Sequence, residues 1–304
     1  MRHAFMIIAH HQFELLEQLI RCLDNPNNDI YIHIDAKVKA FDFVYFSQMA
    51  NFSTITFTER VNVSWGGFSQ IDCELKLLKE AAKGQYDYYH LLSGVDLPLR
   101  SMTQIHAFFE ENSGKEFLHY CTPEYCKSDN VQSRIQYYYL LQEIVGRSSG
   151  LLGIASKCMR KCQKLLGVNR LRKREFEVKC GAQWFSITHE LAEYVLSQET
   201  WIKKYCGNGF CVDELFLQTL VWNSSFRDRL YMPNDKGDYR SCLRYVDWTR
   251  GDPYVFRNED YDELIASEYL FARKFDYQSD KEICERIVRH ATDGSDVNEQ
   301  KQRI

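Results

Sequence analysis

The stretch from Phe5 to Ile34, FMIIAHHQFELLEQLIRCLDNPNNDIYIHI, contains a complete strand–helix–strand pattern. Its two ends, residues 5–9 and 30–34, are short apolar runs that are typical of buried strands. Between them, residues 14–23 place leucine and isoleucine at helical spacing, which predicts one apolar helix face. A helix that joins two buried strands predicts a βαβ unit in which the strands run parallel.

The same alternation continues along the chain. We expect further strands at residues 54–57, 88–92 and 183–187, and further helices at residues 70–82, 190–196, 213–221 and 261–266. This order predicts an α/β fold with a Rossmann-like, mostly parallel sheet flanked by helices. We expect a single domain over residues 1–276, composed of two halves (1–100 and 101–276) and followed by a charged tail (277–304).

Composition excludes several classes of protein. The chain has 304 residues and a net charge of −4, without the excess of Lys and Arg that a general nucleic-acid binder needs. No G-x-G-x-x-G follows the first strand and no G-x-x-x-x-G-K-[ST] occurs, which argues against a dinucleotide-dependent oxidoreductase and an NTPase.

Cysteine usage and the N-terminus bear on the compartment. The eleven cysteines contain no C-x-x-C pair, so we expect mostly free thiols and a reducing compartment. The apolar run after Met1 is too short for a signal peptide, and no run of about 18 apolar residues occurs. We therefore expect a cytoplasmic protein.

Polar residues follow three of the expected strands, where the ligand crevice of a parallel sheet lies. His10 ends the first strand, Asp35 the second, and Asp96 follows the strand at residues 88–92. Capping of their own turns is the alternative interpretation of His10 and Asp35.

Two adjacent acids, Asp213 and Glu214, precede the apolar run Leu215-Phe216-Leu217. At the start of a helix, carboxylates interact favourably with the macrodipole and accept hydrogen bonds from free amides. Helix capping is therefore the plain interpretation of the pair, and catalysis is the alternative.

Seven segments together resemble the core-2/I-branching β-1,6-N-acetylglucosaminyltransferase family, which includes peptide-O-xylosyltransferases. They are His33–Lys37, Trp65–Ser69, Leu91–Leu99, Gly181–Phe185, Asp213-Glu214, Arg244–Trp248 and Phe271–Asp276. The resemblance spans residues 5–276 and implies an inverting enzyme of GT-A-like fold that uses a sugar nucleotide. It also implies that residues 1–100 are the nucleotide-binding half and residues 101–276 the acceptor-binding and catalytic half.

The resemblance also implies roles for individual residues. Glu214 falls on the family's catalytic base, with Asp213 as the second choice and as a contact of the acceptor. His10 and Asp35 suit contacts to uracil and ribose, and Asp96 would orient the donor or the acceptor. Trp248 resembles an aromatic residue that flanks the acceptor, although a core position is equally compatible; Trp65 and Trp184 are expected in the core.

We expect no metal and no other cofactor, because only one acid follows the strand at residues 88–92, whereas a metal-binding D-x-D needs two. The branching enzymes of this family replace the metal with an Arg and a Lys, which correspond to Arg250 and Lys274; Arg244 and Arg257 are alternatives to Arg250. The one D-x-D spacing, Asp260-Tyr261-Asp262, is predicted to start a helix.

The resemblance implies transfer of N-acetylglucosamine from its UDP donor to a glycan hydroxyl, with inversion to a β linkage. UDP-xylose is the nearest rival donor, and a binding protein that has lost catalysis is the rival of a different class. Since the chain lacks the family's animal-type anchor, we expect a bacterial enzyme that builds surface polysaccharide.

Residues 151–179 combine nine Lys or Arg with apolar residues, which predicts a basic amphipathic segment. Peripheral contact with the inner membrane, next to a lipid-linked acceptor, is one interpretation. A solvated helix or loop over the acceptor cleft is the other.

Overall fold

A six-stranded sheet forms the centre of the molecule. The computed structural model describes residues 1–148, 150–232 and 236–301, and the side chains through residue 292. The strand order is β3-β2-β1-β4-β7-β6. The strands are β1 (His3–Ala9), β2 (Asn28–Ile34), β3 (Ile55–Phe57), β4 (Tyr88–Ser93), β6 (Phe117–Leu118) and β7 (Phe185–Thr188).

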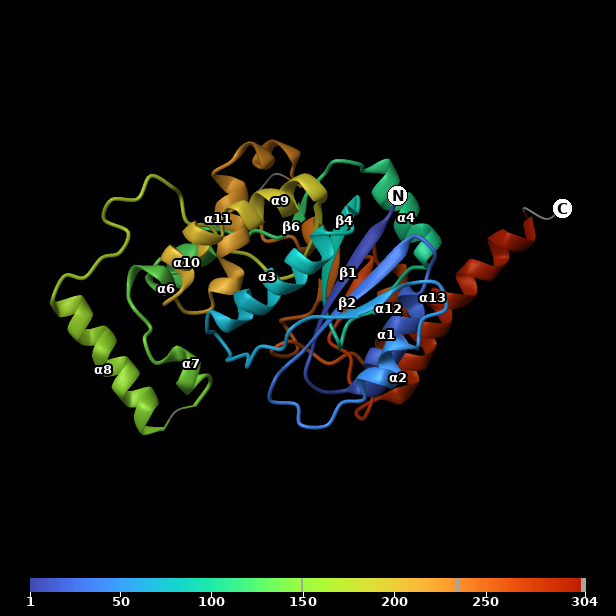
Figure 1. Cartoon of the computed structure of the whole chain (residues 1–304), viewed down its shortest axis with the longest axis horizontal. Coiled ribbons are helices and arrows are strands. Elements are labelled where there is room, and N and C mark those ends of the chain that lie inside the picture. The colour runs from blue at the N-terminus through green and yellow to red at the C-terminus, as the bar shows by residue number, and fades with distance from the viewer. Residues whose placement is uncertain (149, 233–235, 302–304) are drawn as a thin grey trace.

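Strands β1 to β4 run parallel, and β7 is antiparallel to both of its neighbours. The predicted α/β fold, a mostly parallel sheet flanked by helices, is confirmed (Figure 1). The two halves expected at residues 1–100 and 101–276 share this sheet, because β6 and β7 extend it beside β4.

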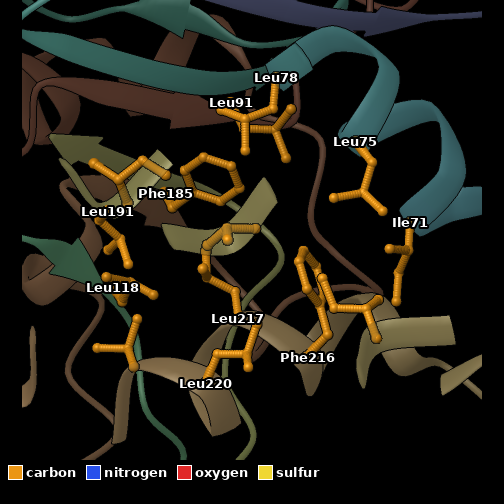
Figure 2. Packing of buried hydrophobic residues seen from close by; sticks show 14 of the residues in the cluster. Ile71, Leu75, Leu78, Leu91, Leu118, Phe185, Leu191, Phe216, Leu217 and Leu220 are labelled. Carbon is orange, nitrogen blue, oxygen red and sulfur yellow. The ribbon is translucent and has the colours of Figure 1, made fainter. Parts of the chain in front are cut away.

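The sheet separates two apolar clusters, because successive side chains of a strand point to opposite faces. Ala4 and Met6 of β1 belong to one cluster, and Phe5, Ile7 and Ala9 belong to the other. The first cluster is covered by α3 (Ser69–Ala82), α9 (His189–Ser197) and α11 (Phe216–Trp222), whose side chains meet in Figure 2. The second is covered by α1 (Phe13–Leu23), α4 (Met102–Glu111) and α13 (Lys281–Lys301).

A smaller sheet, β5-β9-β8, packs where β4 and β7 separate. It consists of β5 (Leu97–Pro98), β8 (Arg244–Val246) and β9 (Phe271–Arg273). The pairing of β4 with β7 ends at His90 and Ser186. The next two carbonyls, those of Leu91 and Phe185, accept hydrogen bonds from the fully buried guanidinium of Arg244 at 3.2 and 2.7 Å.

The remaining helices are short, apart from α8. They are α2 (Phe43–Ser47), α5 (Pro123–Ser128), α6 (Ser133–Gln136), α7 (Gln142–Val145), α8 (Leu151–Leu165), α10 (Glu199–Cys206) and α12 (Tyr261–Ala266). Four 3-10 helices complete the described elements: η1 (Val212–Glu214), η2 (Ser225–Arg229), η3 (Tyr239–Cys242) and η4 (Asn258–Asp260). The expected helix start at Asp260-Tyr261-Asp262 is confirmed by η4 and α12.

Two sequence-based expectations need correction. The helix expected over residues 213–221 is interrupted at Leu215, so Asp213 lies in η1 and its side chain caps no helix. The charged tail expected from residue 277 instead contains α13, whose Ile283, Cys284 and Ile287 are fully buried. Ile283, Cys284 and Ile287 have a spacing typical of one buried helix face, but the sequence-based expectation missed it among the surrounding charges.

None of the helices in the described part of the chain combines the length and the apolar character that a membrane span requires.

Candidate active site

The carboxyl ends of β1 and β2 bring His10 and Asp35 together with two lysines. Asp35 is buried, and its Oδ1 accepts the backbone N–H of Lys37 at 2.8 Å while its Oδ2 lies 3.4 Å from Lys37 Nζ. Partial burial lowers the pKa of His10; the charge of Asp35 opposes this, and the charges of Lys37 and Lys274 add to it. The sequence-predicted residues His10, Asp35 and Lys274 therefore occupy one neighbourhood.

Lys274 supplies this neighbourhood with an available cation. It follows β9, and its carbonyl oxygen accepts the backbone N–H of Phe256 at 2.9 Å. Within residues 1–148, 150–232 and 236–292, no carboxylate pairs with its ammonium. The charge of Lys274 is thus free to act on an anionic ligand.

Arg250 is arranged differently from Lys274. Its guanidinium lies between the carboxylates of Asp247 and Asp260, the latter at 2.6 Å, and 4.2 Å above the Tyr254 ring. Two carboxylates therefore compensate its charge locally. The alternative Arg244 is wrong as a ligand contact, because its side chain is fully buried; the backbone N–H of Arg257, the other alternative, donates to Asp260 Oδ2 at 2.7 Å.

Asp96 lies below the surface of the site. Its Oδ2 accepts the backbone N–H of Ser93 at 2.9 Å, and its Oδ1 accepts Arg273 Nε at 3.0 Å. Burial raises the pKa of Asp96, and Arg273 counteracts this. Arg273 also lies 4.2 Å from the centre of the Trp184 ring, which is buried as expected. In this arrangement Asp96 holds Arg273 rather than facing a ligand.

Glu214 is the more solvent-exposed of the two acids in η1. Its side chain is 41% exposed, and its Oε2 accepts Arg134 at 2.6 Å, while the same guanidinium donates to Asp129 at 2.5 Å. The described part of the chain offers no hydrogen bond to Oε1 of Glu214. One oxygen is therefore held by a cation, and the other is available to a substrate.

Asp213 points the other way, into the protein. Its Oδ2 accepts Gln70 Nε2 at 3.0 Å, whereas its buried Oδ1 has no partner among the described residues. Burial raises the pKa of Asp213 to about 7, and the neighbouring charge of Glu214 adds to this. Glu74 lies buried nearby, and burial raises its pKa as well.

Two backbone contacts fix the position of η1. The carbonyl of Glu214 accepts the N–H of Gly181 at 2.9 Å, and the carbonyl of Gly66 accepts the N–H of Cys211 at 2.9 Å. A Cβ on Gly181 would lie 1.7 Å from the carbonyl oxygen of His119, so only glycine fits there. Two of the segments noted in the sequence, Trp65–Ser69 and Gly181–Phe185, thus support the acidic pair.

Two exposed aromatic rings lie near this turn. Trp248 is 49% exposed and donates from Nε1 to the hydroxyl of Tyr239 at 2.8 Å. Burial raises the pKa of Tyr239, and the charge of Glu214 is among the further causes, so the aromatic pair lies within electrostatic reach of Glu214. Trp65 is 41% exposed, so its expected core position is wrong, as is the core alternative for Trp248.

Three further residues of the site have no recognisable sequence signal. Arg134 holds Glu214, Gln70 holds Asp213, and Glu143 accepts the N–H and the hydroxyl of Ser69 at the start of α3. They come from distant parts of the chain and form no motif with the acids. No group of three or more potential metal ligands occurs within the described residues.

Comparison with known proteins identifies relatives of the chain. A model of the core-2/I-branching enzyme family matches residues 3–264. Xylosyltransferase sqv-6 of Caenorhabditis elegans is 27% identical over 87% of this chain, and the match covers 33% of that protein. The human β-1,3-galactosyl-O-glycosyl-glycoprotein β-1,6-N-acetylglucosaminyltransferase is 22% identical over 91% of this chain and 66% of its own length.

The chain thus spans about a third of the length of the xylosyltransferases it matches. Among solved structures, apo mouse xyloside xylosyltransferase 1 aligns with 89% of this chain and 96% of its own, at 11% identity and a TM-score of 0.40.

Replacement of Gly181 tests the packing behind Glu214. We expect Gly181→Ala to lower the free energy of unfolding by roughly 1–3 kcal/mol, because the new methyl group clashes with backbone that cannot move alone. Turnover should fall too, since the N–H of Gly181 holds the carbonyl of Glu214. Thermal unfolding and transfer assays measure both effects. Ala182→Gly, which adds no atoms, is the control; equal behaviour of the two variants would contradict the clash.

The pKa of Asp213 predicts a pH dependence of stability. The carboxyl titrates at about 7 in the folded chain and at about 4 when unfolded. Between these values the folded state binds more protons, so Asp213 makes stability fall as pH rises through this window. Asp213→Asn removes this dependence, and we expect its gain in melting temperature over wild type to be larger at pH 8 than at pH 5. An equal difference at both pH values would contradict the buried, protonated carboxyl.

Proposed function

Because the chain belongs to the core-2/I-branching enzyme family, we propose that it is an inverting glycosyltransferase that transfers N-acetylglucosamine from UDP-N-acetylglucosamine to a glycan hydroxyl. The observation that carries the proposal is the geometry of Glu214. Its side chain is half-exposed, one oxygen is held by Arg134, and the other is available for an acceptor hydroxyl.

The reaction is a single displacement at the anomeric carbon. Oε1 of Glu214 accepts the proton of the acceptor hydroxyl, whose oxygen then attacks the anomeric carbon. The bond to UDP breaks on the opposite face, so the configuration inverts to a β linkage. Arg134 fixes the carboxylate in place, and Trp65 and Trp248 offer exposed aromatic faces against which sugar rings can stack.

The departing UDP carries the negative charge of the reaction. Lys274 and His10 lie at the carboxyl ends of β9 and β1, and Lys37 lies beside Asp35. We assign UDP to this neighbourhood, with His10 and Asp35 contacting the nucleoside and Lys274 the diphosphate. A preorganised cation at the leaving group stabilises the transition state without a metal.

Arg250 has a less direct part in this assignment. Its two carboxylate partners compensate its charge, so we assign the second diphosphate contact to Arg250 only if UDP displaces one of them. Asp96 acts through Arg273, as a positioning residue.

UDP-xylose is the second candidate donor, because xylosyltransferases are among the relatives of the chain. Hydrolysis of several nucleotide sugars in the absence of acceptor distinguishes the two donors. Binding of UDP-sugars without turnover on any acceptor would favour a non-catalytic binding protein.

We further propose a cytoplasmic enzyme of bacterial surface-polysaccharide synthesis that acts on a glycan or a lipid-linked oligosaccharide. This proposal rests on the sequence, in which the eleven cysteines contain no C-x-x-C pair.

Removal of the base tests the assigned chemistry. Glu214→Gln keeps the shape of the side chain but not its proton affinity, so turnover should fall about 10²- to 10⁴-fold with little change in UDP affinity. Asp129→Asn, which removes the other carboxylate on Arg134, is the matched control and should retain most activity. A nearly normal Glu214→Gln enzyme together with an inactive Asp213→Asn enzyme would move the base to Asp213.

The diphosphate contacts predict how activity responds to chelators. Transfer should survive excess EDTA, and Lys274→Ala should lower turnover by about 10²- to 10³-fold through lost leaving-group stabilisation. Arg250→Ala serves as the comparison: a similar loss of rate at an unchanged melting temperature would assign it the second contact. Loss of activity in EDTA with rescue by Mn²⁺ would contradict metal independence.

A further inference from the structure

Helix α8 carries its apolar face on the outside of the molecule. Leu151, Ile154, Cys158, Cys162 and Leu165 follow one another at intervals of three and four residues and so form one ladder along the helix. All five are exposed, Leu151 by 86% and Leu165 by 87%. An amphipathic helix of a globular protein normally turns such a face to the core.

The opposite ladder of α8 attaches the helix to the body. Gly153 and Ser156 are buried, and Arg160 lies 5.0 Å from the centre of the Tyr139 ring. Gln163 makes a paired contact with the backbone of Tyr138, accepting its N–H at 2.8 Å and donating to its carbonyl at 2.9 Å. The outward direction of the apolar ladder is therefore fixed by specific contacts. In Figure 1, α8 lies at the edge of the molecule, away from the central sheet.

The charge around this ladder has one sign. Residues 144–174 contain nine Lys or Arg and no Asp or Glu, although the whole chain has a net charge of −4. Lys157, Lys161 and Lys164 border the apolar ladder along one side of α8, and all three are exposed. The neighbouring Ile144 and Leu166 add exposed apolar area at 71% and 81%. An apolar stripe bordered by lysines matches a bilayer surface, with acyl chains below anionic headgroups.

We propose that the outer face of α8 binds an anionic membrane surface. The face is defined by Leu151, Leu152, Ile154, Leu165 and Leu166 together with Lys157, Lys161 and Lys164. The apolar side chains enter the boundary between headgroups and acyl chains, and the ammonium groups extend to lipid phosphates. This inference does not depend on the proposed function, because membrane binding is measured without turnover.

The attachment of α8 also connects the membrane with the candidate site. The segment under α8 includes Tyr139, whose ring stacks on Phe210 at 5.3 Å, and Phe210 donates its backbone N–H to the carbonyl of Arg134 at 2.9 Å. Arg134 in turn holds Glu214. These contacts link the segment that holds α8 to the carboxylate of Glu214.

Flotation with vesicles tests the proposal on the full chain. We expect wild type to float with vesicles of phosphatidylcholine mixed with phosphatidylglycerol at low salt, to float poorly with phosphatidylcholine alone, and to dissociate as salt is raised. Wild type that stays unbound on the anionic vesicles, or that binds both compositions equally, would overturn the proposal.

Two sets of substitutions separate charge from apolar contact. The charge variant combines Lys157→Gln, Lys161→Gln and Lys164→Gln. Its partition coefficient onto the anionic vesicles should be lower than that of wild type by on the order of 100-fold. The apolar variant combines Leu151→Ser, Ile154→Ser and Leu165→Ser. It should bind the anionic vesicles more weakly than wild type at every salt concentration. Because these side chains are exposed, both variants should keep the melting temperature of wild type.

Matched controls use exposed residues elsewhere on the molecule. The charge control is a triple variant that removes three exposed lysines from α3, its C-terminal end and α10: Lys79→Gln, Lys83→Gln and Lys203→Gln. The apolar control is a double variant that removes two exposed apolar side chains: Val44→Ser and Phe52→Ser. Both controls should bind vesicles as wild type does. Equal loss in the lysine control would show that only the net charge matters and would overturn the assignment to α8.

Self-association of the wild-type chain in solution that the α8 substitutions abolish, without vesicle binding, would assign the face to a second copy instead.

Discussion

The buried guanidinium of Arg244 is the contact on which the arrangement of the site depends. Burial lowers the pKa of Arg244 to about 10, so the side chain remains a cation at neutral pH. An enclosed cation is costly unless acceptors surround it, and here they include the Ser186 hydroxyl and the carbonyls of Leu91 and Phe185. The guanidinium of Arg244 occupies the position where Leu91 of β4 and Phe185 of β7 would otherwise pair, so the two strands separate there. Strands β8 and β9 pack at this opening and form one wall of the site.

Arg244 is also connected, through Ser186, to two buried histidines of the central sheet, His90 of β4 and His3 of β1. The Ser186 hydroxyl that accepts from Arg244 lies 2.8 Å from His90 Nδ1, and His90 Nε2 lies 2.8 Å from His3 Nδ1. Burial lowers the pKa of His3 to about 2, and that of His90 falls well below its usual value, so both rings are neutral. A neutral imidazole has one donor and one acceptor. His90, which contacts Ser186 through Nδ1 and His3 through Nε2, therefore donates one of these two hydrogen bonds and accepts the other.

Local pattern predicted the parts of this molecule that depend on neighbours in sequence. The first βαβ unit, helix α3 and the polar ends of β1 and β2 follow from apolar spacing alone, and His10, Asp35 and Lys274 do come together. The burial of Arg244 and Asp96 was not predictable, because their partners Ser186 and Arg273 are 58 and 177 residues away along the chain. Arg134 was missed for the same reason, as it meets Glu214 from 80 residues away. Trp65 looked like a core residue because composition does not reveal which face of a loop is covered.

The acidic pair shows how one short turn separates two roles. The sequence alone does not distinguish Asp213 from Glu214. In η1, however, the carboxylate of Asp213 points to Gln70 of α3, whereas that of Glu214 points to Arg134. Burial and the neighbouring charge of Glu214 both favour the protonated form of Asp213. Burial raises the pKa of Asp213 to about 7, so this carboxyl holds its proton more strongly than an exposed aspartate does, whereas the carboxylate of Glu214 pairs with Arg134. The turn thus leaves the half-exposed carboxylate of Glu214 on the outside, and Gln70, by holding Asp213, stabilises this division.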